Sequence, residues 1–289
     1  MAEPPTYIAL AEQEERRRSF WSIYILDRLI SCARSRPPAI SDDDCNVQLP
    51  SDDGTLATRD ENDDAQTLRP LLSWETKMSQ PPRGFVLAIL MAWVLGRCTK
   101  FAHGRSGTEK VPPCDPKSDY MAINSSLMLL ESYLDIDKDP VSELIQDARL
   151  SEGENDAKQL GHLIFSRALF HLSHCLLNHP FLLRNRLSAL TNKVPRSFSL
   201  RALQVAEDNA KKLTYLISSA SEGGFLVESS FYTYCVAVSG AIHSMADKTA
   251  QNEDKLGQYD ASQYFQRSLD ILSRLGHLWP MVKNIVSFS

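Results

Sequence analysis

The positions of the apolar residues along the chain predict helices from one end to the other. In most segments apolar side chains recur every three or four residues, as in an amphipathic helix, and no segment alternates apolar and polar residues convincingly as a half-buried strand does. No internal repeat is present. We therefore expect an all-α, bundle-like fold with a single helical domain over residues 1–289. The predicted helices lie within residues 14–30, 68–78, 85–101, 118–134, 151–177, 181–190, 199–217, 225–245 and 264–275, and a terminal helix begins at 278.

The predicted helix from Glu14 to Ile30 is the most distinctive of these segments. Glu14 has the helical spacing to pair with Arg17 and Arg18. Beyond these charges, apolar residues cover most of the helix circumference, and a helix that is apolar nearly all round is buried on most sides. We therefore expect the segment to lie inside the protein, with a stiff exit at Pro37 and Pro38.

Asp27 and Arg28 place two charges inside this apolar stretch. A buried carboxylate is costly unless it is paired and hydrogen-bonded, so Asp27 needs a cation, and Arg34 or Arg36 at the helix exit can supply it. We interpret Asp27 as one half of a structural ion pair. The alternative, a functional carboxylate with a perturbed pKa, lacks a neighbouring acid, nucleophile or histidine.

Composition and charge are ordinary for a globular protein. Hydrophobic residues make up 43% of the chain and charged residues 23%, and the net charge is −5. No basic footprint for nucleic acid is present, and Glu12, Glu14 and Glu15 nearly cancel the arginines at 16–18. Residues 41–66 hold nine acids and a single arginine, which predicts a flexible, solvated acidic loop.

Targeting and cysteine patterns exclude other classes. Residues 1–5 have neither a basic start nor an apolar run, so they are not a secretory signal. The longest apolar run, residues 85–95, is too short to span a bilayer and predicts a buried helix. The six cysteines are scattered without a C-x-x-C pair, so we expect reduced residues of an intracellular protein and no zinc cluster in this chain.

No catalytic or metal-ligating residues are identified. The chain has no P-loop, no G-x-G-x-x-G and no H-E-x-x-H, so we do not expect an enzyme. His171, His174, Cys175 and His179 have helical spacing, but no acidic ligand accompanies them and leucines share the helix. We interpret these histidines as core and helix-end residues.

Two segments carry a resemblance to a known family, the fungal-specific transcription factor domain. The first is E-E-R-R-R-S-F-W-S-I-Y-I-L-D-R with the following S-R-P-P-A-I-S-D-D-D and V-Q-L-P, in which Ser35 stands where the family usually has glycine. The second is L-F-H at 169–171 followed by L-L-N-H-P-F-L, where Asn178 and His179 replace the usual His-Arg. The positions that match the family pattern are Glu15, Arg17, Arg18, Phe20, Trp21, Asp27, Arg28, Arg36, Pro37, Pro50, His171 and Pro180.

The resemblance implies the helical regulatory region of a nuclear transcription regulator. In that family DNA is bound by a zinc cluster upstream of the helical region, so the resemblance implies that this chain binds DNA only through a module it lacks and holds no cofactor itself. It further implies partners in the transcription machinery or other regulators, a small-molecule effector, and no membrane. Because the motif stands near Met1, we expect the first part of the family domain to be missing, through a truncated gene model or in a genuinely short regulator. The alternative function is a helical small-molecule-binding or protein-interaction module without DNA binding.

Overall fold

The computed structural model describes residues 7–51, 67–73, 82–104, 111–134, 143–146, 154–225, 227, 229–252 and 260–279. The fold is all-α, as predicted: within these residues the secondary structure is helical apart from turns and one isolated bridge between Gln48 and Thr67. The elements are α1 (Tyr7–Arg34), the 3-10 helix η1 (Asp42–Asp44), α2 (Leu68–Ser73), α3 (Gly84–Ala102), α4 (Asp119–Glu131), α6 (Glu154–Leu177), α7 (Pro180–Arg186), the 3-10 helix η2 (Ser188–Lys193), α8 (Arg196–Glu222), α9 (Ser230–Asn252) and α10 (Ala261–Gly276).

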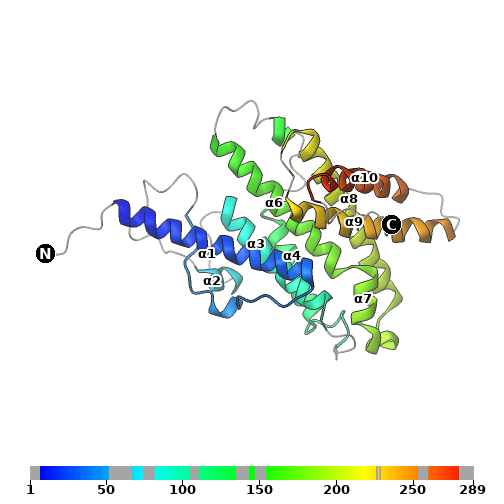
Figure 1. The fold of residues 1–289 in the computed structure, drawn as a ribbon. Coiled ribbons are helices and arrows are strands. Elements are labelled where there is room, and N and C mark those ends of the chain that lie inside the picture. Colours follow the sequence, from blue (N-terminus) through cyan, green and yellow to red (C-terminus); the bar gives the residue numbers. More distant parts are fainter. Residues whose placement is uncertain are drawn as a thin grey trace.

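Helices α3 and α6 pack against each other at the centre of the molecule (Figure 1). Helix α1 lies along α3, and α4 contacts both central helices. On the other side, α8 and α9 pack on α6 and on each other, and α10 covers α9. One hydrophobic core of buried residues runs through these helices from α1 to α10.

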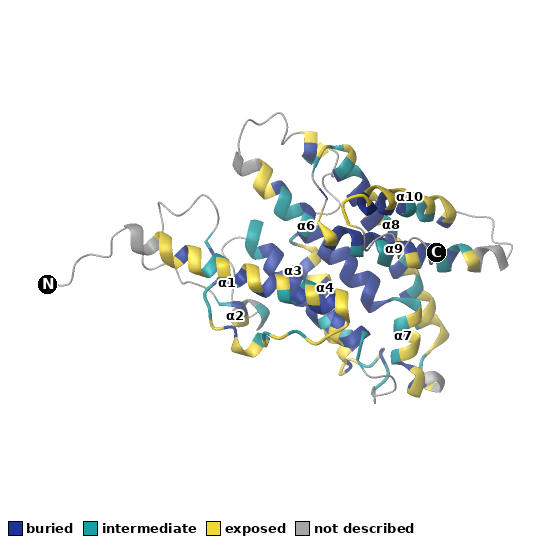
Figure 2. Ribbon diagram, viewed as in Figure 1, coloured by how far each residue is buried: buried dark blue, intermediate teal, exposed yellow. Residues whose placement is uncertain are grey.

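Helix α3 is the most apolar of the described helices. It is long and apolar enough to cross a membrane by length and composition alone, but 78% of that stretch is buried inside the protein. The burial shows that α3 is a core helix, as the run at 85–95 predicted, and Figure 2 shows it as dark blue along much of its length. Burial of apolar surface on this scale is the main force that holds such a fold together.

Helix α1 is buried along one side only, which corrects the prediction that it is buried on most sides. Trp21 and Tyr24 are fully buried, whereas Ile23, Leu26 and Ile30 are 59%, 53% and 46% exposed. These three residues share one face, because a helix brings positions three, four and seven apart together. Helix α3 covers only the opposite face, so this apolar face of α1 is left at the surface (Figure 2).

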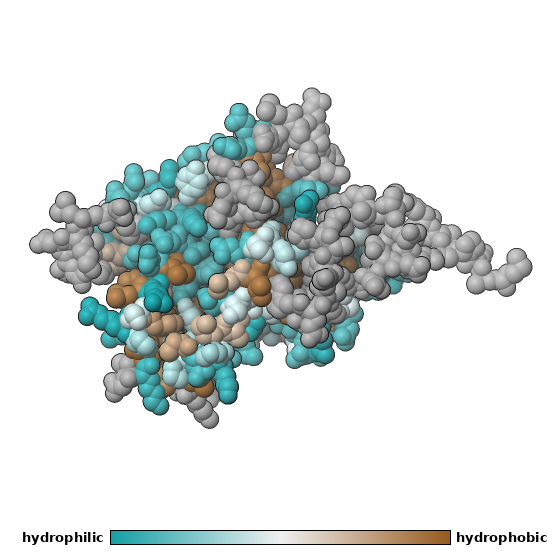
Figure 3. All heavy atoms as spheres, turned by 180° about the vertical axis from the view of Figure 1, so that it is seen from behind, coloured by the Kyte–Doolittle hydropathy of each residue, from teal (hydrophilic) through white to brown (hydrophobic). Residues whose placement is uncertain are grey.

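Exposed apolar residues occur on other helices as well. Met128 on α4, Phe181 on α7 and Leu200 on α8 are each more than half exposed. On the face seen in Figure 3, hydrophobic residues lie in patches among hydrophilic ones. Single apolar residues at a surface are normal for folded proteins.

Several helix ends follow the predicted signals. Ser118 caps α4, because its side chain accepts a hydrogen bond from the backbone N–H of Met121. Helix α8 runs five residues past the predicted range and ends before Gly223 and Gly224, where Gly224 adopts a positive φ of 74°. Helix α10 ends at Gly276, one residue beyond the predicted range.

Two predicted helix starts are wrong. Helix α8 begins at Arg196, directly after the extended N-cap residue Pro195, and not at Ser199. Helix α9 begins at Ser230 and not at Phe225. The backbone N–H of Phe225 instead closes the end of α8 by donating to the carbonyl of Ala220 at 2.8 Å.

Other predicted boundaries are only partly described. The expected helix at 181–190 is divided into α7 and the 3-10 helix η2. Residues 74–78, 151–153, 280–289 and most of the acidic loop, 52–66, lie outside the described residues. The first part of that loop, 41–51, is described, and it contains η1.

Candidate functional site

The motif of α1 is completed by the segment that follows the helix. Residues 37–51, here called the return segment, leave the end of α1 and run back along it towards its start. Contacts between the return segment and α1 occur one or two helical turns apart, from the end of the helix to its beginning. They are Ala39 N to Asp27 Oδ1 (2.9 Å), Tyr24 Oη to Asp42 Oδ1 (2.7 Å), Trp21 Nε1 to the Gln48 carbonyl (2.9 Å) and Ser51 N to Glu14 Oε1 (2.9 Å).

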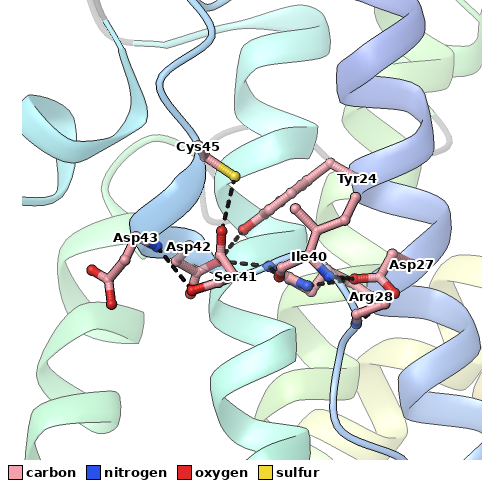
Figure 4. Close-up of polar contacts among 9 residues, drawn as sticks. Tyr24, Asp27, Arg28, Ile40, Ser41, Asp42, Asp43 and Cys45 are labelled. Carbon is pink, nitrogen blue, oxygen red and sulfur yellow. Dashed lines mark hydrogen bonds and ion pairs between the residues drawn. The ribbon is translucent and has the colours of Figure 1, made fainter.

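Arg28 is the centre of this arrangement (Figure 4). Its side chain is only 1% exposed. One terminal nitrogen donates to Asp27 at 2.7 Å, and the other donates to Asp42 at 2.6 Å and to the Ile40 carbonyl at 2.8 Å. The guanidinium also lies 4.1 Å from the centre of the Tyr24 ring. Two carboxylates, a carbonyl and a ring therefore surround the buried charge, as a buried ion requires.

The pKa shifts around Arg28 agree with this picture. Burial alone would lower the pKa of Arg28, but Tyr24 and Asp42 offset that effect, and the pKa lies above its ordinary value. Burial raises the pKa of Tyr24 well above its ordinary value, and nearby Asp42 adds to the rise. Tyr24 therefore stays protonated and can donate its hydrogen bond to Asp42 at any physiological pH.

The partner of Asp27 is not the one expected. Neither Arg34 nor Arg36 binds it; its cation is the next residue, Arg28. Asp27 also accepts hydrogen bonds from the backbone N–H groups of Ala39 and Ile40, so it fastens the return segment to α1. The structural interpretation of Asp27 fits these contacts.

Arg28 reaches this position because α3 has a glycine beneath it. A Cβ atom on Gly96 would lie 2.7 Å from Cδ and 3.1 Å from Nε of Arg28, closer than such atoms approach. Gly96 thus lets the Arg28 side chain pass directly over α3. Arg28 thereby contacts three parts of the chain: α1, the return segment and α3.

The first half of the motif holds the other end of the return segment. Glu14 is 3% exposed and pairs with Arg17 at 3.3 Å and Arg18 at 3.0 Å, as its spacing predicted. Arg18 also donates to the Ser51 carbonyl at 2.8 Å. These arginines are engaged within the protein, as expected from the local charge balance.

The backbone conformation at Ser35 suits glycine, the residue that the family resemblance implies at this position. Ser35 adopts a φ of 51°, a left-handed conformation that glycine accepts more easily than serine. The backbone N–H of Arg36 donates to Ser31, and that of Ser35 to Cys32, which closes the end of α1 in a Schellman arrangement. The left-handed residue turns the chain out of α1 and into the return segment.

The remaining predicted positions are not all part of this arrangement. Glu15, Arg36 and Pro37 are exposed, whereas Pro50 is buried. Phe20 stacks edge-on against Trp21 with 5.2 Å between ring centres. Two predicted positions lie on other helices: His171 is on α6, and Pro180 is at the start of α7.

The histidines of α6 lie in the core. His171 shares a 2.9 Å hydrogen bond with Asn209 of α8, and burial lowers its pKa to about 4. Burial likewise lowers the pKa of His174 to about 3. Both rings are therefore neutral at pH 7. Within the described residues no three histidine, cysteine or acidic side chains gather in a way that would hold a metal ion.

Sequence reasoning did not identify three residues that complete the arrangement. Tyr24 carried a signal, since it precedes Arg28 by one helical turn and so shares its face. Asp42 was one acid among nine, and nothing in the sequence set it apart. Gly96 lies within an apolar run, where an isolated glycine suggests a close approach of another group.

Comparison with known proteins finds a match for this part of the chain. Residues 7–96 match the family model of the fungal specific transcription factor domain, which confirms the resemblance there. The match runs from the first residue of α1 to Gly96. No solved structure shows significant similarity to the chain.

Curated relatives are transcription factors. The chain is 23% identical over 260 residues to a Zn(2)-C6 fungal-type transcription factor, FTF1c, of Fusarium oxysporum f. sp. lycopersici, an alignment over 83% of this chain and 26% of the relative. It is 55% identical over 42 residues to an ABC-transporter-regulating transcription factor of Aspergillus fumigatus, over 14% of this chain and 5% of the relative. The chain spans about a quarter or less of the length of these relatives.

Proposed function

We propose, from the match of residues 7–96 to the family model of the fungal specific transcription factor domain, that the chain is a regulatory region that controls transcription in the nucleus. The observation that carries the proposal is the agreement between the matched residues and the arrangement around Arg28. The match spans α1, the return segment and α3 as far as Gly96, and these are the parts that Arg28 joins.

In this proposal the chain is not an enzyme. Its relatives are named transcription factors, which are not an enzyme family. The strongly shifted pKa values in the described part belong to buried groups such as His171, Cys98 and Cys235, and burial is the main cause of each shift. A reactive cysteine or a catalytic histidine needs the opposite, a solvent-accessible group with an activating partner.

In this proposal, zinc and direct DNA contact are left to a zinc cluster of the kind implied by the name of the Zn(2)-C6 fungal-type relative. Cys32, Cys98, Cys175 and Cys235 are buried, and burial raises the pKa of each thiol above its ordinary value. Zinc binds the thiolate, so these separate, protonated cysteines do not fit a zinc cluster. We propose that DNA recognition in the whole regulator is the task of such a module, and that this chain acts through contacts with other regulators or the transcription machinery.

A tethering experiment tests the proposed function. The 289-residue chain is fused to a bacterial DNA-binding domain and expressed in yeast with a reporter that carries the matching operator. We expect reporter output to differ several-fold from that of the DNA-binding domain alone. Asp27→Ala, which removes a buried contact, should abolish the difference, and Arg16→Ala, which changes an exposed pair, should preserve it.

The control for this experiment is the amount and location of the fusion. Immunoblots and fluorescence of a tagged fusion must show equal amounts of nuclear protein for the fusion and the DNA-binding domain alone. If reporter output is the same for both under those conditions, the proposed regulatory role is wrong.

A further inference from the structure

A cleft of about 880 Å³ lies beside the Arg28 arrangement. One face of α3 forms its floor, and the return segment forms one wall. The floor residues are Trp93, Gly96, Arg97, Lys100 and Phe101, whose helical spacing places them on the same face. Residues of α2, α4 and α7 close the other sides. Its volume is within the range of small-molecule sites in proteins.

Two cations of α3, Arg97 and Lys100, face this cleft and have no acidic partner among the described residues. Arg97 stacks over the Trp93 ring at 5.0 Å and uses one of its five N–H donors on Ser126 Oγ at 3.0 Å. Lys100, three residues further on, is exposed and forms no ion pair with any described residue. No described carboxylate lies within 4.0 Å of the Arg97 guanidinium either. Two adjacent like charges on a helix repel each other, so a negative group between them would be stabilising.

The acids of the cleft do not balance these cations. Asp42 is bound to Arg28 at 2.6 Å, and Asp43 pairs with Arg69 at 3.2 Å. Asp119, at the start of α4, is exposed and pairs with no described cation. The cleft therefore carries more positive than negative charge on its own side chains.

We propose that this cleft binds a small organic anion. Its carboxylate or phosphate oxygens accept hydrogen bonds from Arg97 and Lys100, and its apolar part lies against Pro38, Ile40 and Leu72, which are half-buried at the walls. An arginine that lies over an aromatic ring is well suited to this task, because its side chain is held in place and its donors form a rigid fork. Binding itself depends only on the cleft. Its meaning as a control of transcription rests on the proposed function.

Calorimetry with matched probes tests the proposal on the full chain. The probes are 1-naphthoate, 1-naphthyl phosphate and the neutral 1-naphthylmethanol, which share one apolar ring system. We expect at least one anionic probe to bind with a dissociation constant below 1 mM, and the alcohol to bind at least ten-fold more weakly. Preference for the carboxylate or for the phosphate identifies the chemical class of the anion.

Charge-removing variants locate the binding. Arg97→Gln and Lys100→Gln should each weaken the anionic probe at least ten-fold, whereas Arg274→Gln, on the distant α10, should leave it unchanged. Lys100 is exposed, so Lys100→Gln still tests the proposal if Arg97→Gln fails to fold. The proposal is overturned if neither anion binds below 1 mM, if the alcohol binds as tightly as the anions, or if Lys100→Gln binds like the wild type. The reporter assay needs no added ligand, so a negative result there contradicts the proposed function. A negative result in calorimetry contradicts only the proposal that the cleft binds an anion.

Discussion

Replacing Asp27 with alanine should destabilise the protein strongly. The change removes one of two carboxylates from the Arg28 guanidinium, whose side chain is 1% exposed. It also removes the acceptor of two backbone N–H groups, those of Ala39 and Ile40. Breaking a buried ion pair by removing one partner costs about 3–5 kcal/mol. Asp42 remains bound to Arg28 and Asp27 itself is 15% exposed, so we expect a loss of about 3 kcal/mol, at the lower end of that range.

The matched control is Arg16→Ala. Arg16 pairs with Glu12 at 2.6 Å, but both side chains are mostly exposed, and such pairs contribute less than about 1 kcal/mol. Thermal unfolding followed by circular dichroism at 222 nm measures both variants. For a domain of this size, 3 kcal/mol corresponds to a fall in Tm of about 6–12 °C, whereas Arg16→Ala should shift Tm by no more than about 2 °C.

A third variant separates charge from hydrogen bonding. Asp27→Asn keeps the size of the side chain and one acceptor for the return segment, but it removes the negative charge. Its stability should lie between those of the wild type and Asp27→Ala. Equal, small changes for Asp27→Ala and Arg16→Ala would refute the reasoning, because they would mean that Arg28 does not depend on a buried partner.

Three further changes test other parts of the structure. Ser35→Gly should stabilise the protein by about 1 kcal/mol, since φ is 51° there and the left-handed conformation costs a non-glycine residue about that much; urea midpoints measure the gain. Gly96→Ala should destabilise by about 1–3 kcal/mol through overpacking against Arg28, and most of that loss should disappear in an Arg28→Ala background, which lacks the Cγ, Cδ and Nε atoms that crowd the new Cβ. Acid should destabilise the fold: burial holds the pKa of His171 at about 4, below an unfolded value of about 6.5, so the native state binds fewer protons. The contribution of neutral His171 to the free energy of unfolding should be complete above pH 6.5 and should fall by about 1.4 kcal/mol at pH 5.5. Urea midpoints measured from pH 4 to 8 should show this loss. The variant His171→Gln should lose less stability over the same pH range.

Periodicity alone predicted most of the helices, because each buried face repeats at the period of its own helix. It did not predict which part of α1 is covered. Apolar residues such as Ile23 and Ile30 look the same in the sequence as Trp21, and only the position of α3 decides which of them are buried. The error of predicting a helix buried on most sides follows from this.

The partners of charged residues were predictable only where they are local. Glu14 pairs with Arg17 and Arg18 because helical spacing brings these side chains together. Asp42 reaches Arg28 from a segment that turns back along the helix. The two prolines after α1 predict an extended path but not its direction. The sequence therefore provided no reason to expect that Asp42, in the predicted acidic loop 41–66, contacts α1.

The contacts of α3 separate two kinds of arginine. Arg28 lies over Gly96 with two carboxylates, a carbonyl and an aromatic ring around it, so it has little capacity left for a ligand. Arg97, the next residue of α3 after that glycine, uses one donor within the described protein and faces the cleft. The family match ends at Gly96, between the two. Changes at Arg28 should therefore be measured as changes in folding, whereas changes at Arg97 and Lys100 should be measured as changes in binding. The family match covers Arg28 and carries no information about either of the cations that follow it.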